Sequence, residues 1–200
     1  MKLVGMLDSP YVRRVAISLD LYGVAFEHER LSVFSTYEQF AKINPVVKAP
    51  SLVLDDSTVL MDSSLILDYF ESLAPPAKKL MPQQASARAQ DLYLTGLALA
   101  ACEKTVQIVY EHNLRPAEKL HEPWLDRVTE QLLEAYQALE RRLAYGIDEG
   151  LTQGAITTAV AWSFTQFTVA TVVDANAFLN LQRHVARLEE HQAFRRHPIE

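Results

Sequence analysis

The chain has 200 residues, 49% of them hydrophobic, which is enough for one or two domains with a buried core. Its formal net charge of −6 argues against nonspecific nucleic-acid binding, which relies on a basic surface. No apolar stretch approaches the roughly 18 residues of a membrane span, and the first residues lack the apolar segment of a secretory signal. The lone cysteine, Cys102, cannot form an internal disulfide. We therefore expect a cytoplasmic protein with neither nucleic-acid nor membrane partners.

Strand and helix patterns alternate in the first part of the chain. Apolar residues spaced i, i+3, i+4 and i+7 from Val12 predict a helix, and Gly23 is a typical helix end. Short runs rich in β-branched residues predict two strands around this helix and a hairpin later. The order is β-α-β-α-β-β-α, with the elements expected at residues 2–6, 9–22, 24–32, 36–44, 51–62 (two strands) and 63–73. A βαβ unit followed by a hairpin predicts an α/β layer structure.

The strand pattern disappears after a proline-containing stretch, APPAKKLMPQ, which is typical of a linker. Beyond it, helical periodicity returns four times, at residues 86–112, 124–145, 155–172 and 178–192. Four helices joined by short loops predict a helical bundle. The expected organisation is therefore an α/β domain over residues 1–77, a linker over 78–85 and an all-helical domain over 86–200.

Four local features give this chain a resemblance to the cytosolic glutathione transferase family. They are Ser9 in SPYVRR after the first strand, Ala49-Pro50 in NPVVKAPSLVLDD, Asp62-Ser63 in LMDSSLILDYF, and the run ITTAVAWSF. In the family these match a catalytic hydroxyl of serine-type members, a cis-proline, an acidic-Ser pair and a buried sixth helix. The resemblance implies a thioredoxin-like first domain, glutathione as cosubstrate and no metal; the six histidines form no H-E-x-x-H motif.

Ser9 has two interpretations. Serine followed by proline is a typical helix start, so from the sequence alone a plain N-cap is sufficient. The resemblance implies instead that the hydroxyl donates a hydrogen bond to the glutathione sulfur and stabilises the thiolate. Enzymes that form mixed disulfides hold a cysteine at this turn, which Ser9, Pro10 and Val12 cannot replace.

The other glutathione contacts are also implied by the resemblance. The backbone of Ala49, before cis-Pro50, would hold the cysteinyl part, and Lys48 would reach the glycyl carboxylate. Asp62 would accept from the γ-glutamyl ammonium group, while Ser63 would bind its carboxylate at the helix N-terminus. From the residues alone, Lys48 is equally a solvated charge, and Asp62 and Ser63 are equally a helix cap.

The electrophile pocket would be lined by Tyr11 and by second-domain residues Cys102, Val106 and Tyr110. Tyr11 in a first helical turn is as often a packing residue, and the helical spacing of Cys102 also predicts a core thiol. Pocket residues of this kind identify no substrate, so transferase, isomerase, dehalogenase and peroxidase activities fit equally. The resemblance also implies a homodimer, in which the helix over residues 63–73 lies near the subunit contact.

Two features are harder to interpret. At the expected start of the sixth helix, Gly154 and Thr157 stand at the positions of the family's capping pair, which predicts a loss of reciprocal capping bonds. Arg13 and Arg14 oppose the dipole of the first helix, and either pair with an acidic group or are solvated. The leading prediction is a glutathione transferase acting on a small electrophile. The alternative is a noncatalytic member of the fold that acts as a binding or regulatory module.

Overall fold

The computed structural model describes residues 1–146 and 150–200. The chain forms two compact units: one contains Met1–Pro82 with Glu190–Glu200, and the other contains Gln83–Glu189. The last residues, which we had assigned to the helical domain, thus cluster with the α/β unit. The domain limits given above remain a prediction.

The α/β unit is built on a four-stranded sheet with the order β2-β1-β3-β4. Its strands are β1 (Lys2–Val4), β2 (Glu27–Glu29), β3 (Ser51–Val53) and β4 (Val59–Met61). β1 and β2 are parallel, whereas β1 with β3, and β3 with β4, are antiparallel. This topology confirms the predicted βαβ unit followed by a hairpin.

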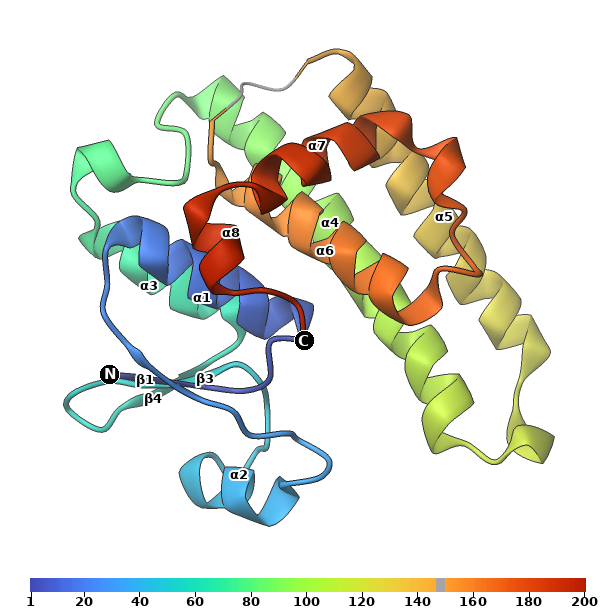
Figure 1. Cartoon of the computed structure of the whole chain (residues 1–200), viewed down its shortest axis with the longest axis horizontal. Coiled ribbons are helices and arrows are strands. Elements are labelled where there is room, and N and C mark those ends of the chain that lie inside the picture. Colours follow the sequence, from blue (N-terminus) through green and yellow to red (C-terminus); the bar gives the residue numbers. More distant parts are fainter. Residues whose placement is uncertain (147–149) are drawn as a thin grey trace. The chain divides into compact units, whose positions relative to one another are not determined.

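Both faces of this sheet are covered. Helices α1 (Pro10–Tyr22) and α3 (Ser63–Leu73) lie on one face, and α2 (Tyr37–Ile43) lies on the other (Figure 1). Leu3 and Val4 are both fully buried, because successive residues of a strand point to opposite faces. The short helix α8 (Gln192–Arg196) packs against α1.

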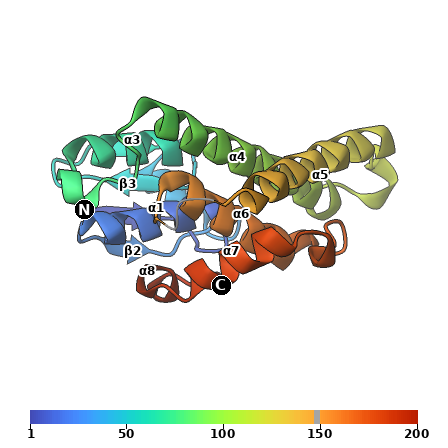
Figure 2. The ribbon, with the colours of Figure 1, turned by 90° about the horizontal axis from the view of Figure 1, so that it is seen from above.

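The second unit is all helical. It contains α4 (Ala85–Leu114), α5 (Glu122–Ala144), α6 (Gln153–Val169) and α7 (Leu179–Glu189). α4 lies alongside α5, as Figure 2 shows, and also packs against α6. By length and composition α4 could cross a membrane, but a core helix of a soluble protein passes the same test. Short 3₁₀ turns at Pro76–Lys78, Ala117–Lys119 and Ala175–Ala177 complete the elements, and the predicted bundle is confirmed.

The start of α6 corrects our expectation about its cap. The N-cap is Thr152, whose hydroxyl accepts from the N–H of Ala155 at 3.2 Å, and not Gly154. The N–H of Gly154 donates instead to both carboxylate oxygens of Asp91 on α4, at 3.0 and 3.1 Å. We matched Gly154 to the N-cap and Thr157 to the acidic position three residues later, which is two residues too far along the chain. Both lie inside the helix, where they are buried. The carboxylate of Asp91 on α4 therefore provides an acceptor for a backbone N–H in the first turn of α6.

Candidate functional site

Ser9 lies in the turn that joins β1 to α1 and is the N-cap of that helix. Its Oγ accepts a hydrogen bond from the N–H of Val12 at 3.5 Å, which is long for such a bond. Because the oxygen acts as acceptor, the cap does not use the hydroxyl proton. That proton can be donated to a group at the positive end of the helix. The structure also confirms that α1 begins directly after Ser9, with Pro10 in its first turn.

A close backbone approach positions this turn. Gly5 has a φ of +142°, and a Cβ at this position would lie 2.5 Å from a methyl group of Val12. Only glycine accommodates both the backbone angle and the contact without displacement. The N–H of Gly5 donates to the carbonyl of Glu29 at 3.1 Å, and its carbonyl lies 2.8 Å from Nε2 of His28. The chain can therefore leave β1 tightly and bring Ser9 to the start of α1.

An acidic side chain precedes Ser9 in the same turn. Partial burial raises the pKa of the Asp8 carboxyl above its ordinary value, and a hydrogen bond from the backbone of Ser9 lowers it by a smaller amount. In its ionised form Asp8 would repel an anionic sulfur placed near Ser9. The groups that stabilise a thiolate here must therefore contribute more free energy than this repulsion costs.

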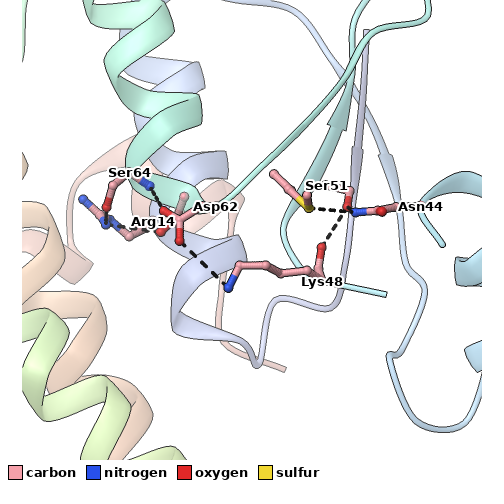
Figure 3. A network of polar contacts seen from close by, with 8 residues as sticks. Arg14, Asn44, Lys48, Ser51, Asp62 and Ser64 are labelled. Carbon is pink, nitrogen blue, oxygen red and sulfur yellow. Dashed lines mark hydrogen bonds and ion pairs between the residues drawn. The ribbon is translucent and has the colours of Figure 1, made fainter. Parts of the chain in front are cut away.

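The loop that carries Lys48, Ala49 and Pro50 is braced by two polar side chains. The amide nitrogen of Asn44 donates to Oγ of Ser51 at 2.8 Å, and Ser51 donates to the carbonyl of Lys48 at 2.7 Å (Figure 3). The Ala49-Pro50 bond is cis, as the resemblance predicted. The two hydrogen bonds brace the backbone around Ala49, just before β3 begins.

Asp62 and Ser63 form the N-terminus of α3. Asp62 is the N-cap, and its Oδ1 accepts from the N–H of Ser64 at 2.9 Å. Its φ of +72° is unusual for a residue other than glycine, and such backbone conformations cluster at functional sites. Ser63 is buried and is the first helical residue, so its N–H has no partner within the helix. The cap predicted from the sequence is thus present.

Lys48 and Asp62 face each other. Nζ of Lys48 lies 3.9 Å from Oδ2 of Asp62, and both side chains are about half exposed (Figure 3). An exposed ion pair of this length contributes little to stability. The pair places one positive and one negative group within reach of an incoming zwitterion. Oδ1 of Asp62 caps α3, but Oδ2 makes only this long contact with Lys48.

The two arginines of α1 are buried, so the expectation of solvated charges is wrong. Arg13 is 1% exposed; its Nε donates to the carbonyl of His197 at 2.8 Å, and its guanidinium lies 5.6 Å from the ring centre of Phe194. Arg14 is 3% exposed, and its Nη1 donates to Oγ of Ser63 and of Ser64. The dipole penalty at the helix start is therefore offset by contacts made within the α/β unit.

The predicted electrophile-pocket residues belong to different units. Tyr11 is half-buried in the first turn of α1. Cys102, Val106 and Tyr110 follow each other at intervals of four residues on α4, so they share one side of that helix. Cys102 is almost fully buried, as the core interpretation predicts, whereas Tyr110 is 42% exposed. Their assembly into a pocket stays a prediction.

Four polar residues of the site were not predicted as part of it. Asn44 and Ser51 brace the Lys48 loop, and Arg14 and Ser64 lie at the start of α3. Asn44 stands before Pro45, and this typical turn signal could have identified it as a structural residue of the loop. Arg14 and Ser64 are 50 residues apart, and no local pattern relates them. Within residues 1–146 and 150–200, no group of three His, Cys, Asp or Glu side chains could hold a metal ion.

Known proteins resemble this chain over both units. The family "Glutathione S-transferase, N-terminal domain" matches residues 3–78. The uncharacterized GST-like protein YibF of Escherichia coli (strain K12) is 30% identical over 161 residues, which cover 80% of this chain and 79% of that protein. A glutathione transferase family member from Pseudomonas fluorescens Pf-5, solved with bound glutathione, is 28% identical with a TM-score of 0.86, covering 100% of this chain and 98% of that one.

A second solved structure shares the fold of this chain. A glutathione S-transferase from Methylobacterium radiotolerans JCM 2831, in complex with glutathione sulfonate, has a TM-score of 0.89 at 24% identity and covers 98% of this chain and 92% of that one. The α/β unit is thus a thioredoxin-like domain, followed by a mostly helical part as in these structures. The long match to YibF spans both parts at the sequence level. The chain therefore belongs to the glutathione S-transferase family.

Proposed function

We propose that the protein is a glutathione transferase that activates the glutathione thiol through Ser9. The observation that carries this proposal is the position of Ser9 as the N-cap of α1. Its oxygen accepts a long cap bond from Val12, so its proton is available to a sulfur at the N-terminus of α1. Serine is then a hydrogen-bond donor to the thiolate, not a nucleophile or a base.

The two ends of glutathione would be held by the groups around Ser9. Asp62 accepts from the γ-glutamyl ammonium group, and Ser63 donates to the neighbouring carboxylate. The backbone of Ala49 pairs with the cysteinyl residue, and Lys48 approaches the glycyl carboxylate. The 3.9 Å separation of Lys48 and Asp62 supports these roles, because Nζ of Lys48 and Oδ2 of Asp62 give up little when a ligand replaces their contact.

In the proposed reaction the thiol loses its proton to solvent, and the thiolate attacks the electrophilic carbon. With an aryl chloride, the sulfur–carbon bond forms, the carbon–chlorine bond breaks and chloride leaves. The residues that we expect to contact the electrophile are Tyr11, Cys102, Val106 and Tyr110. Glutathione is a cosubstrate, and this chemistry uses no metal.

We also propose a cytoplasmic homodimer. α3 exposes an apolar stripe of Leu65 (66% exposed), Tyr69 (40%) and Leu73 (62%), spaced by four residues on one side of the helix. A second subunit would cover this stripe. Light scattering at micromolar concentration should give twice the chain mass of 22.6 kDa. A mass near that of a single chain would exclude the dimer.

Two measurements test the proposed activity. Calorimetry with glutathione should show binding, and 1-chloro-2,4-dinitrobenzene with glutathione should give the thioether faster than the uncatalysed reaction at neutral pH. Binding without turnover on a panel of aryl halides, epoxides and unsaturated carbonyls would instead favour the binding module. Absence of glutathione binding would exclude the transferase and leave the noncatalytic module, which acts through protein contacts.

A further inference from the structure

Arg14 lies directly behind the N-terminus of α3. Its guanidinium is almost fully buried, and Nη1 lies 3.3 Å from Oγ of Ser63. The same nitrogen lies 3.3 Å from Oγ of Ser64 (Figure 3). The arginine belongs to α1, the same helix that Ser9 caps. One rigid helix therefore carries the proposed thiol-binding hydroxyl and also contacts the proposed γ-glutamyl subsite.

Arginine imposes a direction on these two hydrogen bonds. A guanidinium has N–H donors and no acceptor, so both serine oxygens must accept from it. Each hydroxyl proton then points to a different partner. These two bonds do not use the hydroxyl protons of Ser63 and Ser64, so both protons can be donated to an acceptor at the N-terminus of α3, where the N–H of Ser63 also has no partner within the helix.

The charges at this helix end favour an anion. The N-terminus of an α-helix carries a partial positive charge, and the guanidinium of Arg14 adds a full charge close behind it. A charge enclosed in protein interacts more strongly than an exposed one, because the surrounding dielectric is lower. Asp62, on the outer side, provides the acceptor that an ammonium group requires. The arrangement therefore suits the carboxylate and the ammonium of one amino acid end.

We propose that Arg14 is a positioning residue that makes this end of α3 selective for a carboxylate. It holds the hydroxyls of Ser63 and Ser64 as donors and does not itself touch the ligand. The inference rests on the proposed function, in which this carboxylate is that of the γ-glutamyl residue. Arg14 would thus affect the choice of ligand through Ser63 and Ser64, without being one of the residues that contact glutathione.

The test compares two ligands by calorimetry: glutathione, and an analogue in which the γ-glutamyl α-carboxylate is a carboxamide. The wild-type protein should prefer glutathione. In Arg14→Met, affinity for glutathione should fall about tenfold and affinity for the amide much less, since an amide also offers an acceptor and does not need a polarised donor pair. Arg14→Lys, which keeps the charge but not the planar fork, should recover part of the preference.

Arg13→Met is the matched control. Arg13 is the neighbouring buried arginine, and its contacts with Phe194 and His197 lie away from α3. This variant should lose comparable packing but keep the wild-type preference for glutathione over the amide. If Arg14→Met does not fold by circular dichroism, Arg14→Gln gives the same comparison, because glutamine is uncharged and can accept as well as donate.

The outcomes separate this inference from the proposed function. If the wild-type protein binds neither ligand, the proposed function and the inference both fail. If the wild-type protein prefers glutathione and the folded Arg14→Met or Arg14→Gln variant keeps that ratio, only the inference fails, and Arg14 is a structural residue. A preference that shrinks in these variants and stays in Arg13→Met supports it.

Discussion

Replacing Ser9 by alanine tests the proposed chemistry most directly. A free thiol has a pKa of about 8.5, and lowering it by two units requires about 2.7 kcal/mol of preference for the anion. One hydrogen bond to a charged group supplies about 1.5–3 kcal/mol, and a helix N-terminus adds about 0.3–1 kcal/mol. Repulsion from Asp8 reduces this sum, so the hydroxyl must supply most of the effect. Removing it should raise the pKa of the bound thiol by about one to two units.

The assay is a titration of thiolate absorbance at the ultraviolet edge with glutathione bound. With a wild-type thiol pKa of about 6.5, the thiolate fraction at pH 7 should fall by roughly 3- to 25-fold in Ser9→Ala. Turnover should fall with it and recover in part at higher pH. Binding of glutathione should change much less, because Asp62, Ser63 and Lys48 remain.

Two further variants separate the hydroxyl from the cap. Ser9→Gly should keep the helix start within a few tenths of a kcal/mol but lose the pKa effect, since glycine is a good N-cap without a donor. Ser9→Thr should keep both. If the bound thiol titrates at the same pH in the wild-type protein and in Ser9→Gly, Ser9 is only a cap and the catalytic assignment is wrong.

The remaining predictions concern recognition, packing and pH. Asp62→Ala should weaken glutathione binding by about 10- to 150-fold in a folded variant, because a hydrogen bond to a charged group contributes roughly 1.5–3 kcal/mol. An unchanged Kd by calorimetry would show that Asp62 is only a helix cap. Asp91→Ala should lower the free energy of unfolding by about 1–3 kcal/mol, because the buried N–H of Gly154 loses its acceptor. Gly154→Ala should destabilise the helical unit, since its Cβ would lie 2.6 Å from Oδ1 of Asp91; an unchanged Tm in either variant would contradict this account. Burial lowers the pKa of His184, whose ring contacts the carbonyl of Ala155. The stability that the neutral ring contributes is therefore fully present above the ordinary histidine pKa of about 6.5, and it is lost as the pH falls from there through the lower pKa of the folded state. Denaturant unfolding across this range should show a shallower decline for His184→Gln.

Local patterns in the sequence were sufficient for much of this protein. Apolar spacing predicted the helices and the βαβ unit with its hairpin, because one face of each element must be buried whatever it packs against. Ser9 and Asp62 were predicted as helix starts for a similar reason. An N-cap contacts backbone groups only two or three residues away, so its partners are visible in the sequence.

Contacts between distant segments were beyond the reach of such patterns. Arg14 looked like an unfavourable charge at a helix start, and its serine partners became apparent only when α1 and α3 packed side by side. The cap of α6 was misplaced because part of it comes from Asp91, 63 residues earlier in the chain. A buried polar group requires a partner, but sequence spacing does not indicate which segment provides it. Folding brings these groups together by burying the apolar faces of the helices that carry them.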